Sequence, residues 1–192
     1  MRIIFRVDAS IHIGIGHVMR CLSLAVELKN NGIDVRFICR KHKGHLINII
    51  RSRGIQVYEL EIPKKKISNN ELFNSSWLGT SQLQDAKECI EKISQIKVNL
   101  LIVDHYGIDH IWQNAVKGCY ERLMVIDDLA DRTHNCNILL DQNFGRIKED
   151  YIKLVPKSCK VLLGPKYALL RSEFAQWRKY SLNRRKYPEL KK

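Results

Sequence analysis

The chain has 192 residues, of which 45% are hydrophobic and 28% are charged, and its formal net charge is +13. This composition excludes a disordered chain, because it offers enough apolar surface to offset the entropy lost on folding. No apolar run approaches the roughly 18 residues that a membrane-spanning helix needs. The early apolar run at residues 3–5 is cut by Arg6 and Asp8, which argues against a secretory signal.

A basic excess predicts an anionic partner such as nucleic acid, phosphate or a membrane surface. The distribution of the basic charge along the chain limits which anionic partners it can indicate. Residues 1–150 carry 21 basic and 18 acidic side chains, a net charge of +3, whereas residues 151–192 carry 12 and 2, a net charge of +10. The chain has no recognisable nucleic-acid motif and no platform of interleaved aromatic residues. We therefore expect no nucleic-acid partner, and keep a basic nucleic-acid-binding protein as the least favoured hypothesis.

The chain has six cysteines, at positions 21, 39, 89, 119, 136 and 159. Most of them lie inside apolar segments, which favours reduced, buried thiols in a cytoplasmic protein. Cys119, His134 and Cys136 form the best candidate for a zinc site, but three ligands without paired spacing are a weak signal. We therefore expect no metal ion and no cofactor.

Short apolar runs alternate with helical patterns along the chain. The first half predicts a strand over residues 2–7, a loop over 8–16, a helix over 18–28, a strand over 35–39, a helix over 46–53, a strand over 56–60 and a lysine-rich surface loop over 63–74. The second half predicts a helix over 83–93 capped by Thr80 or Ser81, a strand over 98–103, a helix over 111–120, strands over 123–126, 138–140 and 161–163, and a helix over 173–182. This order predicts an α/β, Rossmann-like parallel sheet covered on both faces.

Ligands of such sheets bind beyond the carboxyl ends of the strands. The segments to consider are therefore residues 8–17, Arg40, residues 104–107 and residues 127–128. Two tryptophans outside these segments, Trp77 and Trp112, are expected to be packing residues.

The most informative local pattern is Gly14-Ile15-Gly16-His17, which follows a strand and opens a helix. Glycines let the backbone approach a ligand closely, and a helix start favours negative charge. A dinucleotide-binding loop is one alternative, with Arg40 taking the phosphate of NADP, but Met19 stands where the third glycine belongs. A connection without any ligand is the other.

A histidine at a helix start is held neutral and can act as a general base, although a lone His17 is also typical of a capping or surface residue. Residues 104–107 contain Asp, His and Tyr in succession and suit a hydroxylated ligand, or equally a turn that caps the next helix. The pair Asp127-Asp128 suggests acid-base or metal chemistry, or again a turn.

Several blocks of the sequence, taken in order, resemble a known family. The blocks are Phe5-Arg6-x-Asp8, Ile13-Gly14-x-Gly16-His17-x-x-Arg20, Trp77-Leu78-Gly79-Thr80, Gln84-Asp85-Ala86, Asp104-His105-Tyr106-Gly107, Ile126 to Arg132, Asp141-Gln142-Asn143 and Leu163 to Phe174. They are similar to the UDP-sugar hydrolases of pseudaminic acid biosynthesis, a family that also resembles spore-coat polysaccharide biosynthesis proteins.

The resemblance implies the amino-terminal domain of a two-domain, glycosyltransferase-B type fold. It implies removal of UDP from UDP-2,4-diacetamido-2,4,6-trideoxy-β-L-altrose by inverting attack of water, in surface or flagellar glycan biosynthesis, without a metal. The family histidine that matches His17 is its presumed base. The resemblance also suggests substrate-binding roles for a set of matching residues, namely Arg6, Asp8, Gly14, Gly16, Arg20, His105, Tyr106 and Arg171.

The family's chain continues into a second α/β domain that supplies most contacts to UDP, whereas this sequence stops at Lys192. We therefore expect residues 1–172 to form the catalytic-histidine domain and residues 173–192 a basic helix and the start of a linker. The UDP-sugar would be the substrate, and a separate chain could carry the UDP-binding half. A glycosyltransferase half-domain, with a sugar acceptor in place of water, is the main alternative.

Overall fold

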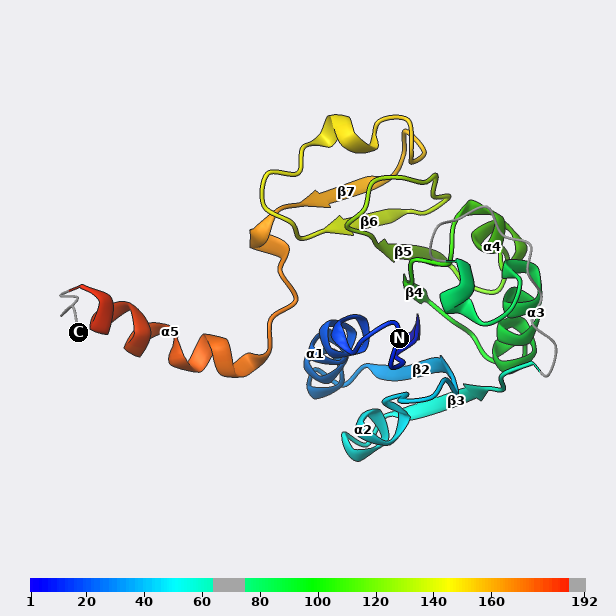
Figure 1. The fold of residues 1–192 in the computed structure, drawn as a ribbon, viewed down its shortest axis with the longest axis horizontal. Helices are drawn as coiled ribbons and strands as arrows, with labels where there is room; N and C mark the ends of the chain where they lie inside the picture. The colour runs from blue at the N-terminus through cyan, green and yellow to red at the C-terminus, as the bar shows by residue number, and fades with distance from the viewer. Residues whose placement is uncertain (64–74, 187–192) are drawn as a thin grey trace.

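The computed structural model describes residues 1–63 and 75–186. Seven parallel strands form one sheet in the order β3-β2-β1-β4-β5-β6-β7 (Figure 1). The strands are β1 (Arg2–Val7), β2 (Asp34–Arg40), β3 (Gln56–Leu60), β4 (Leu100–Asp104), β5 (Arg122–Ile126), β6 (Ile138–Asp141) and β7 (Lys160–Leu163). The predicted α/β, Rossmann-like fold is confirmed, with a strand in each of the seven predicted places.

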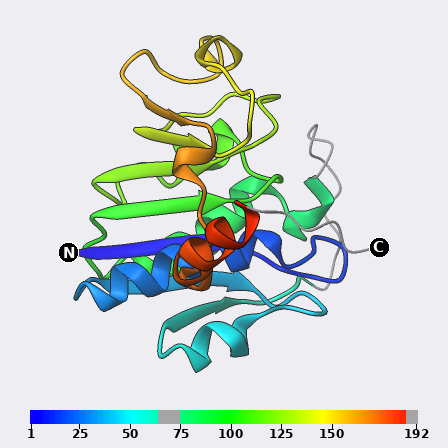
Figure 2. The ribbon, with the colours of Figure 1, turned by 90° about the vertical axis from the view of Figure 1, so that its left-hand side faces the viewer.

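The chain runs from β1 outward to β3, then returns to the other side of β1 with β4 and continues to β7. The direction of chain progression thus reverses between β1 and β4, which makes their carboxyl ends the switch point of the sheet. In Figure 2, β1 starts at the left and runs to the right. The carboxyl ends of the parallel strands and the loop after β1 therefore lie at the right.

Helices cover both faces of the sheet. One face carries α1 (Gly16–Asn30) and α2 (Ile47–Ser52), and the other carries α3 (Gln82–Ile93) and α4 (His110–Ala115). Side chains of a strand alternate between the two faces: Ile3, Phe5 and Val7 pack in the core beneath α1, whereas Ile4 packs in the core beneath α3. Short 3₁₀ turns complete the chain, namely η1 (Ser75–Leu78), η2 (Lys148–Tyr151) and η3 (Pro165–Tyr167).

Local signals explain where the helices begin and end. The Ser81 side chain caps α3 by accepting a 3.2 Å hydrogen bond from the Gln84 backbone N–H, which selects Ser81 from the two predicted caps. The helix predicted over 111–120 was too long, because α4 ends at Ala115 and Gly118 adopts a φ of 97°, which a right-handed helix does not allow. The surface loop predicted over 63–74 lies, from residue 64 onward, outside the described residues.

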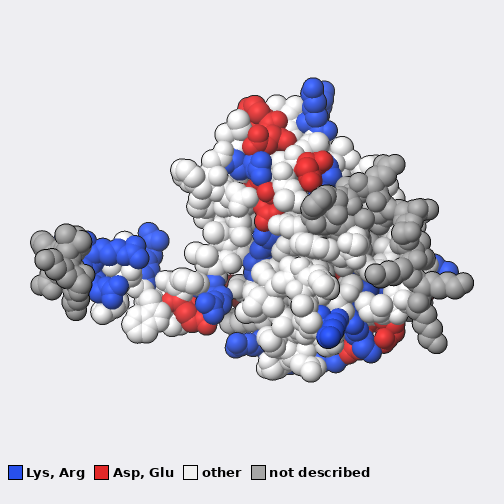
Figure 3. Space-filling view, viewed as in Figure 1, with Lys and Arg blue, Asp and Glu red and all other residues white. Residues whose placement is uncertain are grey.

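The last helix, α5 (Ser172–Arg185), has no buried residue and extends away from the sheet (Figure 1). It confirms the helix predicted over 173–182. Basic side chains gather toward its far end (Figure 3), where the sequence places Arg184 and Arg185. None of the described helices is long and apolar enough to cross a membrane. The proposed boundary at residue 172 stays a prediction.

Candidate active site

The candidate site lies at the carboxyl ends of β1 and β4. In the register of these two strands Val7 pairs with Asp104, so the segments that follow them leave the sheet side by side. The next strand, β5, ends at Ile126 and adds the segment that contains Asp128. Three predicted segments, 8–17, 104–107 and 127–128, therefore meet at the switch point.

His17 lies in the first turn of α1 and is 8% exposed. Its Nδ1 atom is 3.7 Å from Oδ1 of Asp104, and its ring meets the Tyr106 ring edge-on with centroids 4.4 Å apart. Burial lowers the pKa of His17 below its ordinary value of 6.5; the charge of Asp104 opposes this shift and that of Arg20 reinforces it. The imidazole is therefore neutral at neutral pH and able to accept a proton.

A network of charged groups holds Asp104 beside His17. Arg20 donates two hydrogen bonds to the Asp104 carboxylate, at 2.6 and 2.7 Å, and a third to Asp128 at 2.9 Å. The Tyr106 hydroxyl also donates to Asp128. Burial opposes ionisation of Asp128, but the bonds from Tyr106 and Arg20 outweigh it and lower its pKa. The network thus fixes one cation and two anions within reach of the imidazole.

The glycine-containing loop leaves open space at the start of α1. Gly14 adopts a φ of 80° and its N–H bonds the Ser10 carbonyl, which closes a tight turn. A Cβ atom on either Gly14 or Gly16 would meet nothing within 4 Å. The residue before α1, Ile15, supplies no side-chain cap, and the first turn carries no acidic residue. Unpaired backbone N–H groups of a helix start attract anions.

Beneath the site lies a buried cluster around Asp8. Arg6 and Asp8 have no exposed surface, and their side chains are 2.7 Å apart. His105 accepts a hydrogen bond from Gly107 N–H on Nδ1, and its Nε2 atom faces Oδ2 of Asp8 at 3.4 Å. Nε2 of His42 lies 3.6 Å from the same oxygen. Although burial opposes it, the charge of Arg6 holds the pKa of Asp8 well below its usual range.

This cluster places three predicted substrate-binding residues under the site rather than at its surface. Arg6 and Asp8 are enclosed, and the His105 side chain is 1% exposed. In the arrangement described, they support the loop after β1 and the end of β4. Direct contact of Arg6, Asp8 or His105 with a substrate stays a prediction.

The two neighbouring aspartates after β5 have different environments. Asp127 accepts hydrogen bonds from the backbone N–H groups of Leu129 and Ala130 and from the Tyr151 hydroxyl, so it shapes the turn. Asp128 faces Arg20 and Tyr106. The sequence left two interpretations of this pair open. Asp127 has the role of a turn-forming residue, whereas Asp128 is part of the candidate site.

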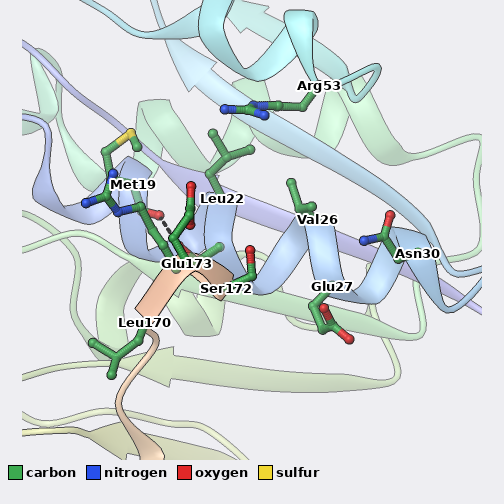
Figure 4. A pocket seen from close by; sticks show the side chains of 11 residues that line it. Met19, Leu22, Val26, Glu27, Asn30, Arg53, Leu170, Ser172 and Glu173 are labelled. Carbon is green, nitrogen blue, oxygen red and sulfur yellow. Dashed lines mark hydrogen bonds between the residues drawn. The ribbon is translucent and has the colours of Figure 1, made fainter. Parts of the chain in front are cut away.

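Arg171, another predicted substrate-binding residue, lines a groove that does not include His17. It precedes α5 and helps to line a groove between α1 and the start of α5; Figure 4 shows this groove with its neighbours Leu170 and Ser172 labelled. The α1 residues that line this groove include Met19, Val26 and Asn30, whereas His17 belongs to the buried side of the same helix. A role for Arg171 in substrate binding stays a prediction.

Two residues acquire roles that the sequence did not indicate. Trp77 stacks on Tyr106 with ring centroids 5.7 Å apart and an interplanar angle of 27°, so it extends the aromatic wall of the site. Arg40 is fully buried and bonds Asp85 at 2.7 Å and Glu88 at 2.7 Å, which leaves it unable to bind the phosphate of NADP. Trp112 is a packing residue, as predicted, and also donates its indole N–H to Asp85.

In the part of the chain that the structure describes, no group of three or more His, Cys, Asp or Glu side chains is arranged to hold a metal ion. Of the candidate zinc ligands, Cys136 lies next to the Cys159 thiol and His134 bonds Gln113.

Comparisons with known proteins identify relatives but no matching protein-family model. Over 177 residues the chain is 34% identical to UDP-2,4-diacetamido-2,4,6-trideoxy-beta-L-altropyranose hydrolase of Campylobacter jejuni, a match that covers 92% of this chain and 54% of the hydrolase. It is 26% identical over 194 residues to an uncharacterized protein of Methanocaldococcus jannaschii, covering all of this chain and 35% of that protein. Among solved structures, MurG of Acinetobacter baumannii aligns with a TM-score of 0.48 and 12% identity, over 83% of this chain and 44% of that chain.

The resemblance found in the sequence motifs is therefore confirmed. The chain spans about half the length of the Campylobacter hydrolase and about a third of the Methanocaldococcus protein. This coverage is consistent with the amino-terminal half that the motifs predict.

Proposed function

We propose that this chain is the catalytic-histidine half of a nucleotide-sugar hydrolase. Its substrate would be UDP-2,4-diacetamido-2,4,6-trideoxy-β-L-altropyranose, the compound in the name of the Campylobacter relative. The observation that carries the proposal is His17, a buried neutral imidazole at the switch point with a carboxylate behind it. The corresponding fold is the amino-terminal domain of a glycosyltransferase-B type protein, and the pathway is cytoplasmic synthesis of pseudaminic acid for surface glycans.

The hydrolysis reaction requires mainly a correctly positioned general base. Water attacks the anomeric carbon with inversion, His17 takes the proton from the water, and the bond to the phosphate oxygen breaks so that UDP leaves with the electron pair. UDP is already a stable anion, so the enzyme has chiefly to orient and deprotonate the water. A neutral histidine is the residue type suited to that step.

Asp104 gives His17 a direction and a counter-charge. Once His17 is protonated, the carboxylate stabilises the imidazolium, as the aspartate of a catalytic triad does. The 3.7 Å separation between Nδ1 and Oδ1 is longer than a hydrogen bond, and such contacts commonly tighten only when substrate is bound. Arg20 holds the Asp104 side chain in place through its paired hydrogen bonds.

The sugar would lie against the aromatic wall formed by Tyr106 and Trp77, above the open loop at Gly14 and Gly16. A sugar carrying acetamido and methyl groups presents apolar patches that suit such rings. We propose that contacts to uridine and diphosphate come mainly from a second α/β half, in the same chain or in a separate one. Arg171 would contact the substrate only if the substrate extends toward that second half.

The test measures UDP release by chromatography. The chain is assayed alone and fused to the part of the Campylobacter jejuni hydrolase that it does not match. We expect little or no turnover by the chain alone, because binding energy from the nucleotide is missing, and turnover by the fusion. His17→Phe should abolish it, whereas His110→Phe, which changes an exposed histidine at the start of α4, should not.

Product analysis separates hydrolysis from sugar transfer. Free sugar of inverted anomeric configuration supports the hydrolase, whereas a glycoside formed only with an added acceptor identifies a transferase. Unchanged turnover in the His17→Phe fusion would overturn the assignment of His17 as the base.

A further inference from the structure

Two cysteines lie next to each other at the edge of the sheet away from the candidate site. The Sγ atoms of Cys136 and Cys159 are 3.7 Å apart. Cys136 precedes β6 and Cys159 precedes β7, and these are neighbouring strands. All six cysteines are free thiols in this structure. Among the described residues, these two thiols contact each other within hydrogen-bonding distance.

The backbone around the pair is already fixed. Asn137 N–H bonds the Leu123 carbonyl at 2.9 Å, and Lys160 N–H bonds the Asn137 carbonyl at 2.9 Å. Cys159 N–H bonds the Pro156 carbonyl at 2.8 Å. A disulfide has a sulfur–sulfur distance of about 2.05 Å, so the two sulfurs must approach by about 1.7 Å. Since these hydrogen bonds hold the backbone, we expect the approach to come from rotation of the two side chains.

The two thiols differ in accessibility and reactivity. Cys136 is buried, whereas Cys159 is only half-buried and is therefore the more accessible of the two. A hydrogen bond from the Cys136 thiol lowers the pKa of Cys159, although burial opposes this shift. By contrast, burial raises the pKa of Cys21, Cys39 and Cys89. Thiolates are the reacting species, so Cys159 is the cysteine suited to attack.

We propose that Cys136 and Cys159 form a redox-active dithiol that a small disulfide of the glutathione type converts into an intramolecular disulfide. The Cys159 thiolate attacks one sulfur of oxidised glutathione, whose S–S bond breaks and releases one glutathione. The Cys136 thiol then loses its proton and its sulfur attacks Sγ of Cys159, releasing the second glutathione. The two cysteines lose two electrons, which reduce oxidised glutathione to two thiols.

The Cys136–Cys159 disulfide would link the edge strand β7 covalently to its neighbour β6. β7 has one strand neighbour, β6, and the disulfide joins the segments that begin these two strands. It closes a loop over residues 137–158, which contains Tyr151, whose hydroxyl donates to Asp127 and Asp141. Restricting this loop in the unfolded chain should raise the melting temperature of the oxidised form by roughly 6–12 °C. The inference is independent of the proposed hydrolase function.

The test uses the whole chain in its native state. The reduced protein is incubated with a graded ratio of oxidised to reduced glutathione, quenched with an alkylating reagent, and analysed by intact mass and peptide mapping. We expect loss of two of the six thiols, a mapped Cys136–Cys159 peptide, no retained glutathione, and reversal by reductant. Thermal unfolding of the oxidised form reports the stabilisation.

Single variants separate the two chemical steps. Cys136→Ser should stop after the first step and keep one glutathione on Cys159, whereas Cys159→Ser should retain none. Cys119→Ser is the matched control, because Cys119 is also half-buried but burial raises its pKa, and it should react like the parent chain. Six alkylated thiols after oxidation of the parent, or a disulfide mapped to another pair, would overturn the proposal without reference to any variant.

Discussion

The buried carboxylate of Asp85 is the group whose removal should most weaken this fold. Asp85, on α3, has no exposed surface and accepts hydrogen bonds from Arg6 at 2.6 and 3.0 Å, from Arg40 at 2.7 Å and from the Trp112 indole at 2.8 Å. Asp85→Ala leaves two buried guanidinium groups and one indole N–H with lost partners. Breaking a buried ion pair by deleting one member costs about 3–5 kcal/mol.

The remaining contacts place the expected loss near the lower end of that range. Arg6 keeps the Asp8 carboxylate at 2.7 Å, and Arg40 keeps Glu88 at 2.7 Å. We therefore expect a loss of about 3 kcal/mol in the free energy of unfolding. For a chain of this length, that corresponds to a fall of roughly 6–12 °C in melting temperature. It is also a large part of the roughly 5–15 kcal/mol that stabilises a typical domain.

Urea unfolding of Asp85→Ala beside Asp34→Ala tests the argument. Asp34 also accepts hydrogen bonds from two arginines, Arg2 and Arg36, but its side chain is 38% exposed. Water screens such a pair, so its loss should cost about 1 kcal/mol or less. Equal losses in the two variants would refute the reasoning, because they would show that burial does not set the value of these ion pairs.

Four further predictions concern the candidate site. Titration of His17 by NMR should give a pKa below 6.5. Asp104→Asn should lower this pKa further, because it removes the charge that favours the imidazolium. A higher pKa in the variant would contradict the placement of Asp104 beside His17. Since the unfolded chain binds this proton more readily, stability from neutral His17 should be lost as pH falls below 6.5. Gly16→Ala should leave thermal unfolding nearly unchanged yet slow UDP release by the fusion, whereas Gly14→Ala, at a φ of 80°, should cost about 1–2 kcal/mol. Tyr106→Phe removes a hydrogen bond to Asp128 and should cost about 1 kcal/mol in chemical unfolding; no loss would show that this bond is not stabilising.

The sequence predicted where the site lies better than how its side chains point. Short apolar runs located every strand that the structure describes, and the rule for parallel sheets then brought segments 8–17, 104–107 and 127–128 together. Side-chain direction follows the period of two along each strand. Ile4 packs beneath α3, so Arg6 and Asp8 belong to that face, where Arg6 meets Asp85. That alternation was a usable signal for the position of Arg6 beneath the surface.

The same alternation separates Asp104, the last residue of β4, and the two residues after it. Asp104 and Tyr106 meet α1 and Asp128, whereas His105 between them turns toward Asp8. The partners themselves could not be predicted, because Arg6 and Asp85 are separated by 79 positions and no local pattern links them. The helix predicted over 111–120 was too long for a different reason, since α4 ends at Ala115 and Gly118 adopts a φ of 97°, which a right-handed helix does not allow.

The paired arginines at this end of the sheet limit how far the net charge of +13 can attract a ligand there. Arg6 is paired with Asp8 and Asp85, Arg20 with Asp104 and Asp128, and Arg40 with Asp85 and Glu88. Each guanidinium is therefore neutralised by carboxylates before any ligand arrives, and the basic excess lies instead in residues 151–192. Among the described residues, Arg20 beside His17 is already paired, so a diphosphate approaching His17 would meet the backbone N–H groups at the start of α1. This pairing is consistent with the proposal that a second α/β half supplies most contacts to the nucleotide while His17 supplies the base.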